Sequence, residues 1–417
     1  MMFQNQNLKN NTLWNRAIIL IDMNAFFASI EQLDHPEWQG RAIAVTNGKQ
    51  GTCIITSSYE ARSYGIKTGM RLQEAKQLCR HVIQVPARPD RYAEVSTAIM
   101  EGLSSLSPDI EIFSVDEAFI DVTHCQLLYG TPQEIGWMAK EIVFNKSGLL
   151  CSVGVSGDKT TAKYAAKLKK PDGYVVIPPW EAKERLHDVP VTELSGIKSG
   201  IGGFLAKHGA RTCGDVANIP ISILAKRFGN LGRRIWYMCQ GADPEPVHTV
   251  VPNPKSMGHG KVMPPNTTSK MVIDSFLMHM CEKLGARLRQ HHFKAQHFFA
   301  GLLNKDLGWL GGKSRTIQNT NDSYEIFQLA DFLIAQYWNG EPVYQIQVTA
   351  LDPSDSGFQC DLFSKTNDKR QELYSACDEI NHKYGEFTIA PLSMLHRSQM
   401  PNVIAPAWKP YGHRQTL

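Results

Sequence analysis

Carboxylates that directly follow strand-like apolar runs constrain this chain more than any other feature of its sequence. Asp22 ends the run IILID at residues 18–22, and the adjacent acids Asp116 and Glu117 lie within SVDEAFI at residues 114–120. Adjacent carboxylates on such an element repel one another unless a cation lies between them. A solvated turn is the alternative, because it is the usual environment of an Asp-Glu pair. Two such segments favour a shared divalent metal site, and Mg²⁺ with oxygen ligands is the typical ion.

Length and composition indicate a globular protein of several domains. With 417 residues the chain exceeds what one hydrophobic core usually supports, so we expect two to four domains. Its nine cysteines show no C-x-x-C spacing, which argues against a disulfide framework or a zinc site and favours a reducing, cytoplasmic environment. The longest early apolar stretch covers only residues 17–21, too short for a signal peptide or a membrane span. No membrane association is therefore expected.

Positive charge is concentrated in two segments. Residues 255–315 contain ten Lys or Arg against three acids, and residues 159–170 contain five lysines. The formal net charge of the whole chain is only +4, so the rest of the chain is slightly acidic. Basic surface of this kind suits the phosphate backbone of nucleic acid, a contact that does not depend on base sequence. Lysine-rich helix faces that serve solubility are the alternative.

Apolar periodicity predicts an alternation of strands and helices over the first 177 residues, which gives a sheet covered by helices. Strands are expected at 17–21, 41–45, 52–56, around Asp116 and at 151–155, and helices at 25–33, 92–106, 132–145 and 159–169.

The chain then becomes helical over residues 179–241. LSGIKSGI at residues 194–201 resembles a helix-hairpin-helix turn, in which glycines let backbone N–H groups approach a phosphate. A glycine turn between packed helices, without any ligand, is the alternative. A stiff, proline-studded linker leads from there to a second α/β unit. Helices are expected there at 269–291 and 325–337 and strands at 295–303, 313–318 and 344–351, followed by a polar tail with a helical segment at 370–384.

Five separated segments resemble the motifs of the Y-family DNA polymerases, the error-tolerant enzymes of translesion synthesis, and most of all their bacterial DNA polymerase IV branch. The segments are IDMNAFF at 21–27, TSSYEARSYGIKTGM at 56–70, SVDEAFIDV at 114–122, SVGVS at 152–156 and KKPDG at 169–173. Their order and spacing are also those of the family, and chance agreement at five places is implausible.

The resemblance implies a multidomain α/β and α+β fold in the form of a right hand. The palm would be ferredoxin-like, the fingers small, the thumb helical with the helix-hairpin-helix, and the little finger α/β. The expected boundaries are a flexible leader at 1–16, palm at 17–24 and 87–177, fingers at 25–86, thumb at 178–246, linker at 247–255, little finger at 256–352 and a C-terminal tail at 353–417.

The resemblance also implies a set of site residues. Asp22, Asp116 and Glu117 match the catalytic metal ligands, with the carbonyl of Met23 as a fourth ligand. They would hold two Mg²⁺ ions, for which Mn²⁺ can substitute, to activate the primer 3′-hydroxyl and neutralise charge on the phosphates. Phe27 matches the steric gate, a ring that leaves no room for a 2′-hydroxyl; a core phenylalanine is the alternative. Contacts to the deoxynucleoside triphosphate match Phe26, Phe27, Thr56, Tyr59, Arg62 and Lys170, whose cationic groups suit a polyphosphate.

Contacts to primer–template DNA and to a protein partner follow from the same resemblance. The DNA contacts would be Gly196, Lys198 and Gly200 in the thumb turn and Lys255, Ser256 and Lys261 at the entry to the little finger. After that entry, residues 260–266 depart from the charged pattern of the family. QCDLF at 359–363 fits the peptide that bacterial replication proteins lay into the sliding clamp, with Gln359, Leu362 and Phe363 as its anchors.

Two further residues near the motifs are not metal ligands by this resemblance. Asn24 stands where many relatives carry Asp, and we expect it to matter little. Asp121 has no counterpart as a ligand and is expected to be structural.

The predicted function is template-directed DNA synthesis in translesion synthesis and DNA repair, with low fidelity and without proofreading, by a cytoplasmic monomer. A catalytically inactive, polymerase-like accessory protein that recruits other factors to damaged DNA is the main alternative, and the presence of all three carboxylates argues against it. A nucleotide cyclase would leave the hairpin and the basic second unit unexplained. A structural DNA-binding protein would leave the triphosphate residues unexplained.

Overall fold

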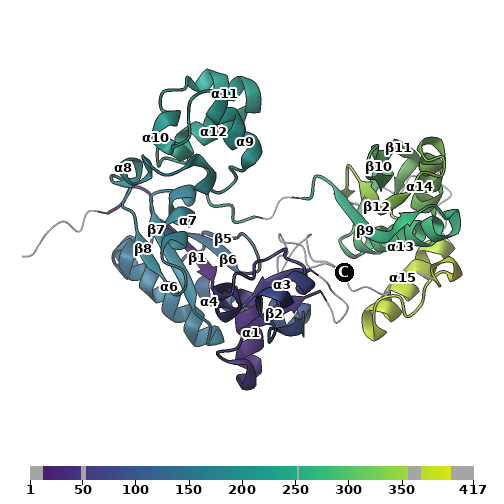
Figure 1. The fold of residues 1–417 in the computed structure, drawn as a ribbon, viewed down its shortest axis with the longest axis horizontal. Helices are drawn as coiled ribbons and strands as arrows, with labels where there is room; N and C mark the ends of the chain where they lie inside the picture. The colour runs from purple at the N-terminus through teal and green to yellow at the C-terminus, as the bar shows by residue number, and fades with distance from the viewer. Residues whose placement is uncertain (1–12, 48–52, 251–252, 356–367, 396–417) are drawn as a thin grey trace, which may run out of the picture. The chain divides into compact units, whose positions relative to one another are not determined.

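The computed structural model describes residues 13–47, 53–250, 253–355 and 368–395 (Figure 1). These residues form two compact units, one up to residue 250 and the other from residue 253, and each unit has a hydrophobic core of its own. None of the helices in these ranges is long and apolar enough to cross a membrane.

A five-stranded sheet forms the centre of the first unit. Its middle strand, β1 (Ile18–Met23), is antiparallel to β6 (Glu117–Asp121) on one side and to β7 (Cys151–Ser156) on the other. The edge strands are β5 (Ile110–Ile112) and β8 (Tyr174–Val176). Helices α4 (Pro89–Leu103) and α6 (Pro132–Ser147) cover one face, α7 (Lys159–Leu168) covers the other, and the short α5 (Gln126–Tyr129) precedes α6 (Figure 1).

Both faces of β1 are buried, but against different helices. Ile19 and Ile21 pack with α4 and α6, whereas Ile18 and Leu20 pack against α7. Because successive side chains of a strand point to opposite faces, Asp22 follows Leu20 on the α7 face. The apolar alternation of β1 therefore places the first predicted carboxylate beside α7.

Helix α7 approaches the sheet very closely at Gly154 of β7. A Cβ atom at this position would lie 2.1 Å from the main-chain oxygen of Ala162, so any larger residue would push the helix away. Asp158 caps the helix by accepting a hydrogen bond from the N–H of Thr161 at 2.9 Å. The close approach lets α7 bring its lysines against the same face that carries Asp22.

A smaller lobe follows β1. It contains the three-stranded sheet β3-β2-β4, in which β2 (Ile43–Thr46) is the central strand. The other elements are α1 (Phe26–Asp34), the 3-10 turn η1 (Pro36–Trp38), β3 (Ile54–Ser57), α2 (Tyr59–Ser63), α3 (Leu72–Leu78) and β4 (Ile83–Pro86).

A helical lobe with its own apolar cluster completes the first unit. It contains α8 (Ala182–Leu186), the 3-10 turn η2 (Val191–Glu193), α9 (Ser199–Lys207), α10 (Cys213–Val216), α11 (Ile221–Phe228) and α12 (Asn230–Cys239).

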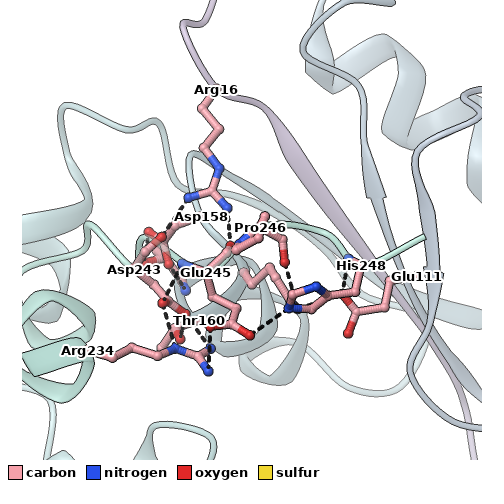
Figure 2. Close-up of polar contacts among 11 residues, drawn as sticks. Arg16, Glu111, Asp158, Thr160, Arg234, Asp243, Glu245, Pro246 and His248 are labelled. Carbon is pink, nitrogen blue, oxygen red and sulfur yellow. Dashed lines mark hydrogen bonds and ion pairs between the residues drawn. The ribbon is translucent and has the colours of Figure 1, made fainter. Parts of the chain in front are cut away.

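The chain that leaves α12 is tied to the central sheet by a polar network (Figure 2). The fully buried Asp243 accepts two hydrogen bonds from Arg234, at 2.8 and 2.9 Å, and one from Thr160 of α7 at 2.6 Å. Further along, Glu111 of β5 accepts from the N–H of His248 at 2.8 Å and pairs with Lys159 at 2.6 Å. The first part of the predicted stiff linker is therefore anchored on the lobe that carries the carboxylates.

The second unit contains an antiparallel sheet of order β11-β10-β12-β9, with α13 and α14 packed on one face. Its elements are β9 (Met257–Thr267), α13 (Lys270–Gln290), β10 (Phe293–Asn304), β11 (Gly308–Thr320), α14 (Ser323–Tyr337), β12 (Val343–Ala350), β13 (Ser354–Asp355), α15 (Asp368–Tyr384) and the 3-10 turn η3 (Leu392–Met394).

Helix α15 is held on this unit by charged groups. Arg289 of α13 donates two hydrogen bonds to Asp378, at 2.6 and 2.9 Å, and stacks over the ring of Tyr374 at 4.3 Å. Arg370 pairs with Asp322 at 3.1 Å. The helix that the sequence predicts within the polar tail is therefore part of the second unit.

Candidate active site

Two of the predicted carboxylates face each other across neighbouring strands. The register of β1 and β6 pairs Asp22 with Glu117. Side chains that are directly opposite in an antiparallel pair lie on the same face, with Cβ atoms roughly 5 Å apart. Phe119, two residues after Glu117, packs against α7 and so confirms which face this is. Two acids that are 95 positions apart in the sequence thus share one patch at the end of the sheet.

Lysines from the α7 side compensate these two acids. Lys163 of α7 contacts Glu117, with 2.7 Å between Nζ and Oε2. Lys170, just after α7, contacts Asp22, with 2.5 Å between Nζ and Oδ2. The ammonium groups supply the positive charge that neighbouring carboxylates need in a partly buried position.

Asp116 completes the acidic patch from the turn before β6. Its carbonyl accepts a hydrogen bond from the N–H of Met23 at 2.9 Å, and its carboxylate accepts one from the hydroxyl of Ser114 at 2.6 Å. The first contact joins the ends of β1 and β6, so both predicted motifs meet here. Met23 itself points its side chain into the core and is 2% exposed.

The carboxylates of Asp22 and Asp116 are in an electrostatically unfavourable environment. Burial raises the pKa of Asp22 to about 7; Lys170 lowers it, and the charges of Glu117 and Asp116 add to the rise. Burial also raises the pKa of Asp116, with a further contribution from Glu117. A hard divalent cation would relieve this repulsion, and carboxylate oxygens are its preferred ligands. The donor set therefore fits Mg²⁺, although the described residues contain no cluster of three His, Cys, Asp or Glu already arranged around a metal position.

The raised pKa of Asp22 predicts that the folding stability of the first unit depends on pH. A carboxyl group whose pKa is higher in the folded state stabilises the fold below its unfolded pKa, and this stability is lost as the pH rises toward 7. We expect Asp22→Asn, in a buffer with chelator, to stabilise the first unit by about 2 kcal/mol at pH 8, which raises its Tm by about 5 °C. The difference should shrink as the pH falls toward 4. Calorimetry of the full chain at several pH values measures it, and a gain that is independent of pH would contradict the assignment.

The smaller lobe brings two predicted phosphate contacts near the acids. The guanidinium of Arg62 lies 4.8 Å from the ring centre of Tyr59 and donates to the carbonyl of Ser57 at 3.1 Å. The hydroxyl of Tyr59 is buried and has no hydrogen-bond partner among the described residues. Burial raises its pKa and the charge of Asp22 adds to the rise, whereas Arg62 and Asn24 lower it, so these three groups lie close to the hydroxyl. A buried, unpartnered hydroxyl beside a carboxylate patch fits a ligand oxygen. Thr56 lies just before them on β3 and is partly buried.

The two phenylalanines at the start of α1 point in different directions. Ala25, which precedes the helix, has left-handed backbone angles (φ 44°, ψ 45°), an uncommon conformation for a residue other than glycine. Phe26 then packs in the core and is 3% exposed, whereas Phe27 is partly exposed and stacks on Tyr92 of α4. The two ring centroids lie 4.4 Å apart at an angle of 17°. Phe26 therefore has a core position, and Phe27 presents a supported ring.

The predicted glycine turn spans the start of α9. Gly196 has φ +87°, and neither it nor Gly200 has an atom within 4 Å of where a Cβ would stand, so their backbone is open to a ligand. Ile197 between them is fully buried, and Lys198 is the exposed residue that precedes α9. A cavity of about 250 Å³ beside this turn is also lined by Lys163. The turn and the acidic patch thus have Lys163 as a common neighbour.

The predicted DNA contacts at the entry to the second unit have different surroundings. Lys255 and Ser256 are exposed. Lys261 lies on β9 on the same face as Met257 and Met263, which the core of this unit buries. Burial lowers the pKa of Lys261, and the charge of Lys283 on α13 lowers it further. Lys261 therefore faces α13, the helix-covered side of the sheet. Gln359, Leu362 and Phe363, the predicted clamp-binding residues, lie outside the described residues.

Four of the five lysines at 159–170 pair with acids of this chain. The sequence interpretation left phosphate binding and a solubilising helix face open for this cluster, and it did not include these pairs. The pairs are Lys159 with Glu111, Lys163 with Glu117, Lys167 with Glu193 and Lys170 with Asp22. Lysines spaced four residues apart lie on one face of a helix, so α7 attaches three neighbouring segments along a single stripe.

Comparison with known proteins shows to which family this chain belongs. The model of the impB/mucB/samB family matches residues 21–167, and that of the impB/mucB/samB family C-terminal domain matches residues 254–362. A solved Y-family DNA polymerase chimera superposes with a TM-score of 0.70 at 26% identity, over 81% of this chain and 98% of that one. The DNA polymerase IV of Moorella thermoacetica is 34% identical over 89% of this chain and 94% of its own length. The chain belongs to the Y family of DNA polymerases.

Other relatives agree with this membership. The DNA polymerase IV of Pelotomaculum thermopropionicum is 32% identical, again over 89% of this chain and 94% of its own length. At the end of the first sheet of this Y-family chain, the acidic patch lies with Lys170, as the motifs predict, and Lys163 joins it. Sequence reasoning missed the pairing of Lys163 with Glu117 and the support of Phe27 by Tyr92. Only the four-residue spacing of the lysines indicates the pairing of Lys163, and no local signal in the sequence indicates the contact of Phe27 with Tyr92.

Proposed function

We propose that this Y-family member is a template-directed DNA polymerase of translesion synthesis that adds deoxynucleotides to a primer 3′-hydroxyl. The observation that carries the proposal is the acidic patch of Asp22 and Glu117 on adjoining strands with Asp116 in the turn before β6, in a chain whose relatives over most of its length are DNA polymerases IV. All three carboxylates are present and adjacent, which is unfavourable for a protein that only recruits partners.

The donor set supports two Mg²⁺ ions held by these three carboxylates and the carbonyl of Met23. When bound, such ions would supply Lewis-acid chemistry, which activates the primer hydroxyl and neutralises charge on the reacting and departing phosphates. The residues of the chain have the other tasks. Lys170, 2.5 Å from Asp22, has an ammonium within reach of a phosphate at the patch.

The smaller lobe would act as the fingers over the incoming nucleotide. Arg62 offers a planar guanidinium and Tyr59 a buried, unpartnered hydroxyl for triphosphate oxygens. Thr56 lies on the strand before them, and Phe27 would lie under the sugar. Gly196, Lys198 and Gly200 of the helical lobe, together with the second unit, would hold primer–template DNA.

Primer extension tests the proposed function directly. The full chain is incubated with Mg²⁺ and four deoxynucleotides on an undamaged template and on templates with an abasic site or a minor-groove guanine adduct. Template-directed extension is the expected result, with bypass of at least one lesion. An intact, DNA-binding protein that extends no primer would favour the accessory-protein alternative.

We also propose a bacterial sliding clamp as a partner, on the basis of QCDLF at 359–363. Replacing Leu362 and Phe363 by Ala is expected to abolish stimulation of extension by the clamp and to leave clamp-free extension unchanged, because two apolar anchors are lost. Cys360→Ser, within the same peptide but at a position without an anchor, is the matched control. Equal stimulation of the double variant and the control would exclude this peptide as the clamp ligand.

A further inference from the structure

Asn24 connects the metal-binding strand to the loop that carries Lys170. It directly follows β1 and is 4% exposed. Its side-chain oxygen accepts a hydrogen bond from the N–H of Asp172 at 2.7 Å, and its side-chain nitrogen donates to the hydroxyl of Ser152 at 2.9 Å. One buried amide therefore joins three segments that are far apart in the sequence. Sequence reasoning expected little from this residue.

The loop at residues 170–173 has a conformation that needs outside support. Asp172 has φ +55°, a left-handed conformation that side-chain-bearing residues rarely adopt. Gly173 is so tightly placed that a Cβ would lie 2.1 Å from the carbonyl oxygen of Lys169. The hydroxyl of Ser152 also accepts from the N–H of Gly173 at 3.3 Å. Two successive N–H groups of the loop thus bind one connected pair of side chains.

Lys140 of α6 holds the same loop from another side. Its ammonium donates to the carbonyl of Asp172 at 2.7 Å and to that of Cys151 at 3.0 Å, and it pairs with the carboxylate of Asp172 at 2.5 Å. The side chain of Lys140 is only 15% exposed, whereas that of Asp172 is 45% exposed. Asn24 and Lys140 are therefore two separate supports of the main chain at Asp172.

We propose that Asn24 is a positioning residue, which fixes the loop so that the ammonium of Lys170 lies at the carboxylate patch. The proposal rests on the proposed function, because Lys170 matters only if the patch binds a nucleoside triphosphate. Lys170 is two residues from the main chain that Asn24 holds, and its Nζ lies 2.5 Å from Asp22. Small displacements of a positioned cation reduce its interaction with a reacting phosphate strongly. Asn24 itself need not touch the substrate.

A double-mutant cycle between Asn24 and Lys170 tests this role. Asn24→Ala is expected to raise the KM for deoxynucleotide about 10-fold, because it removes the buried acceptor of the loop, and Lys170→Ala to raise it about 30-fold. If Asn24 acts through Lys170, the double variant should stay at about 30-fold, whereas independent effects would multiply to about 300-fold. Affinity for primer–template DNA should be unchanged in all three variants.

Two further variants separate positioning from general stability. Gln126→Ala removes another buried amide of the first unit, which contacts the main chain of Trp14 at 2.8 and 2.9 Å, and should leave the KM unchanged. Lys140→Met releases the loop from the other side and should reproduce the rise in KM, even if Asn24→Ala folds poorly.

Each outcome bears on the proposal separately from the function. Multiplying effects in the cycle, an unchanged KM in Asn24→Ala, or an unchanged KM in Lys140→Met would overturn the positioning role while the wild type still extends primers. Absence of extension by the wild type would instead overturn the proposed function. A rise in KM in Gln126→Ala as large as that in Asn24→Ala would also count against positioning, because it would indicate a loss of overall stability.

Discussion

Replacing Asp116 by Asn is expected to reduce the rate of nucleotide incorporation by at least about 1000-fold, because the amide keeps the shape of the side chain but loses the charge that holds a divalent ion. The carboxylate lies beside Glu117 and close enough to Asp22 to raise its pKa. Ser114 donates to it at 2.6 Å, a contact that an amide oxygen can still accept, so the local fold should persist. Single-turnover incorporation at saturating primer–template measures the loss.

The matched control for this variant is Asp121→Asn at the other end of β6. Asp121 accepts hydrogen bonds from the N–H and the hydroxyl of Thr123, at 3.0 and 2.5 Å, and shapes the turn after the strand. The Asp121→Asn variant should retain close to the wild-type rate of incorporation, and both variants should bind DNA like the wild type. If Asp116→Asn kept more than a tenth of the wild-type rate, the acidic patch would not be the centre of the reaction.

Periodicity predicts the strands beside Asp22 and Glu117, and the resemblance to the Y-family polymerases predicts that the two motifs meet. The runs before Asp22 and after Glu117 read as strands, and side-chain alternation decides which face each acid takes. The structure agrees, since β1 is buried at all six positions and pairs with β6 in the register that opposes the two acids. The local signals thus predicted the face of each acid, whereas the pairing of the two strands followed only from the resemblance.

The surroundings of the patch were not predictable because they depend on contacts between distant segments. Asn24 binds Asp172, 148 positions away, and Lys140 binds the same residue across 32 positions. Neither contact leaves a spacing pattern in the sequence, and each side chain alone reads as an ordinary polar residue. Such contacts come from tertiary packing, which local propensity does not encode.

Strand β9 shows a different limit of sequence reasoning. Its segment contains Gly258, Gly260, Pro264 and Pro265, all unfavourable in a strand, so the sequence predicts no strand there. Among the described residues β9 pairs only with β12, at the edge of the second sheet, and its prolines lie between Val262 and Thr267, where the register shifts. Proline is tolerated on an edge strand because one side of the backbone needs no ladder hydrogen bonds. The sequence does not reveal the order of the strands in the sheet, and this order explains why such a segment can form a strand.

Phe27→Ala is expected to lower the preference for deoxynucleotides over ribonucleotides by about 100-fold or more, because a ring is removed from the place of the 2′-hydroxyl. The structure explains why this ring can act as a rigid barrier. It stacks on Tyr92, whose hydroxyl donates to Glu31 at 2.6 Å, and Glu31 in turn pairs with Arg88 at 2.9 Å. A stacked pair of this kind contributes roughly 1 kcal/mol beyond its buried area, so the ring resists displacement by a sugar hydroxyl.

Measuring kcat/KM for a matched pair of deoxy- and ribonucleotides gives the selectivity of each variant. Phe27→Ala should keep deoxynucleotide incorporation within about tenfold of wild type, since the ring excludes a competitor and performs no chemical step. Phe27→Tyr is the matched control and should keep the wild-type selectivity, because it retains the ring and its stack on Tyr92. Unchanged sugar discrimination in Phe27→Ala would remove Phe27 from the gate. The stack of Phe27 on Tyr92 would then serve only core packing, because Tyr92 of α4 holds the Phe27 ring whether or not a sugar lies beside it.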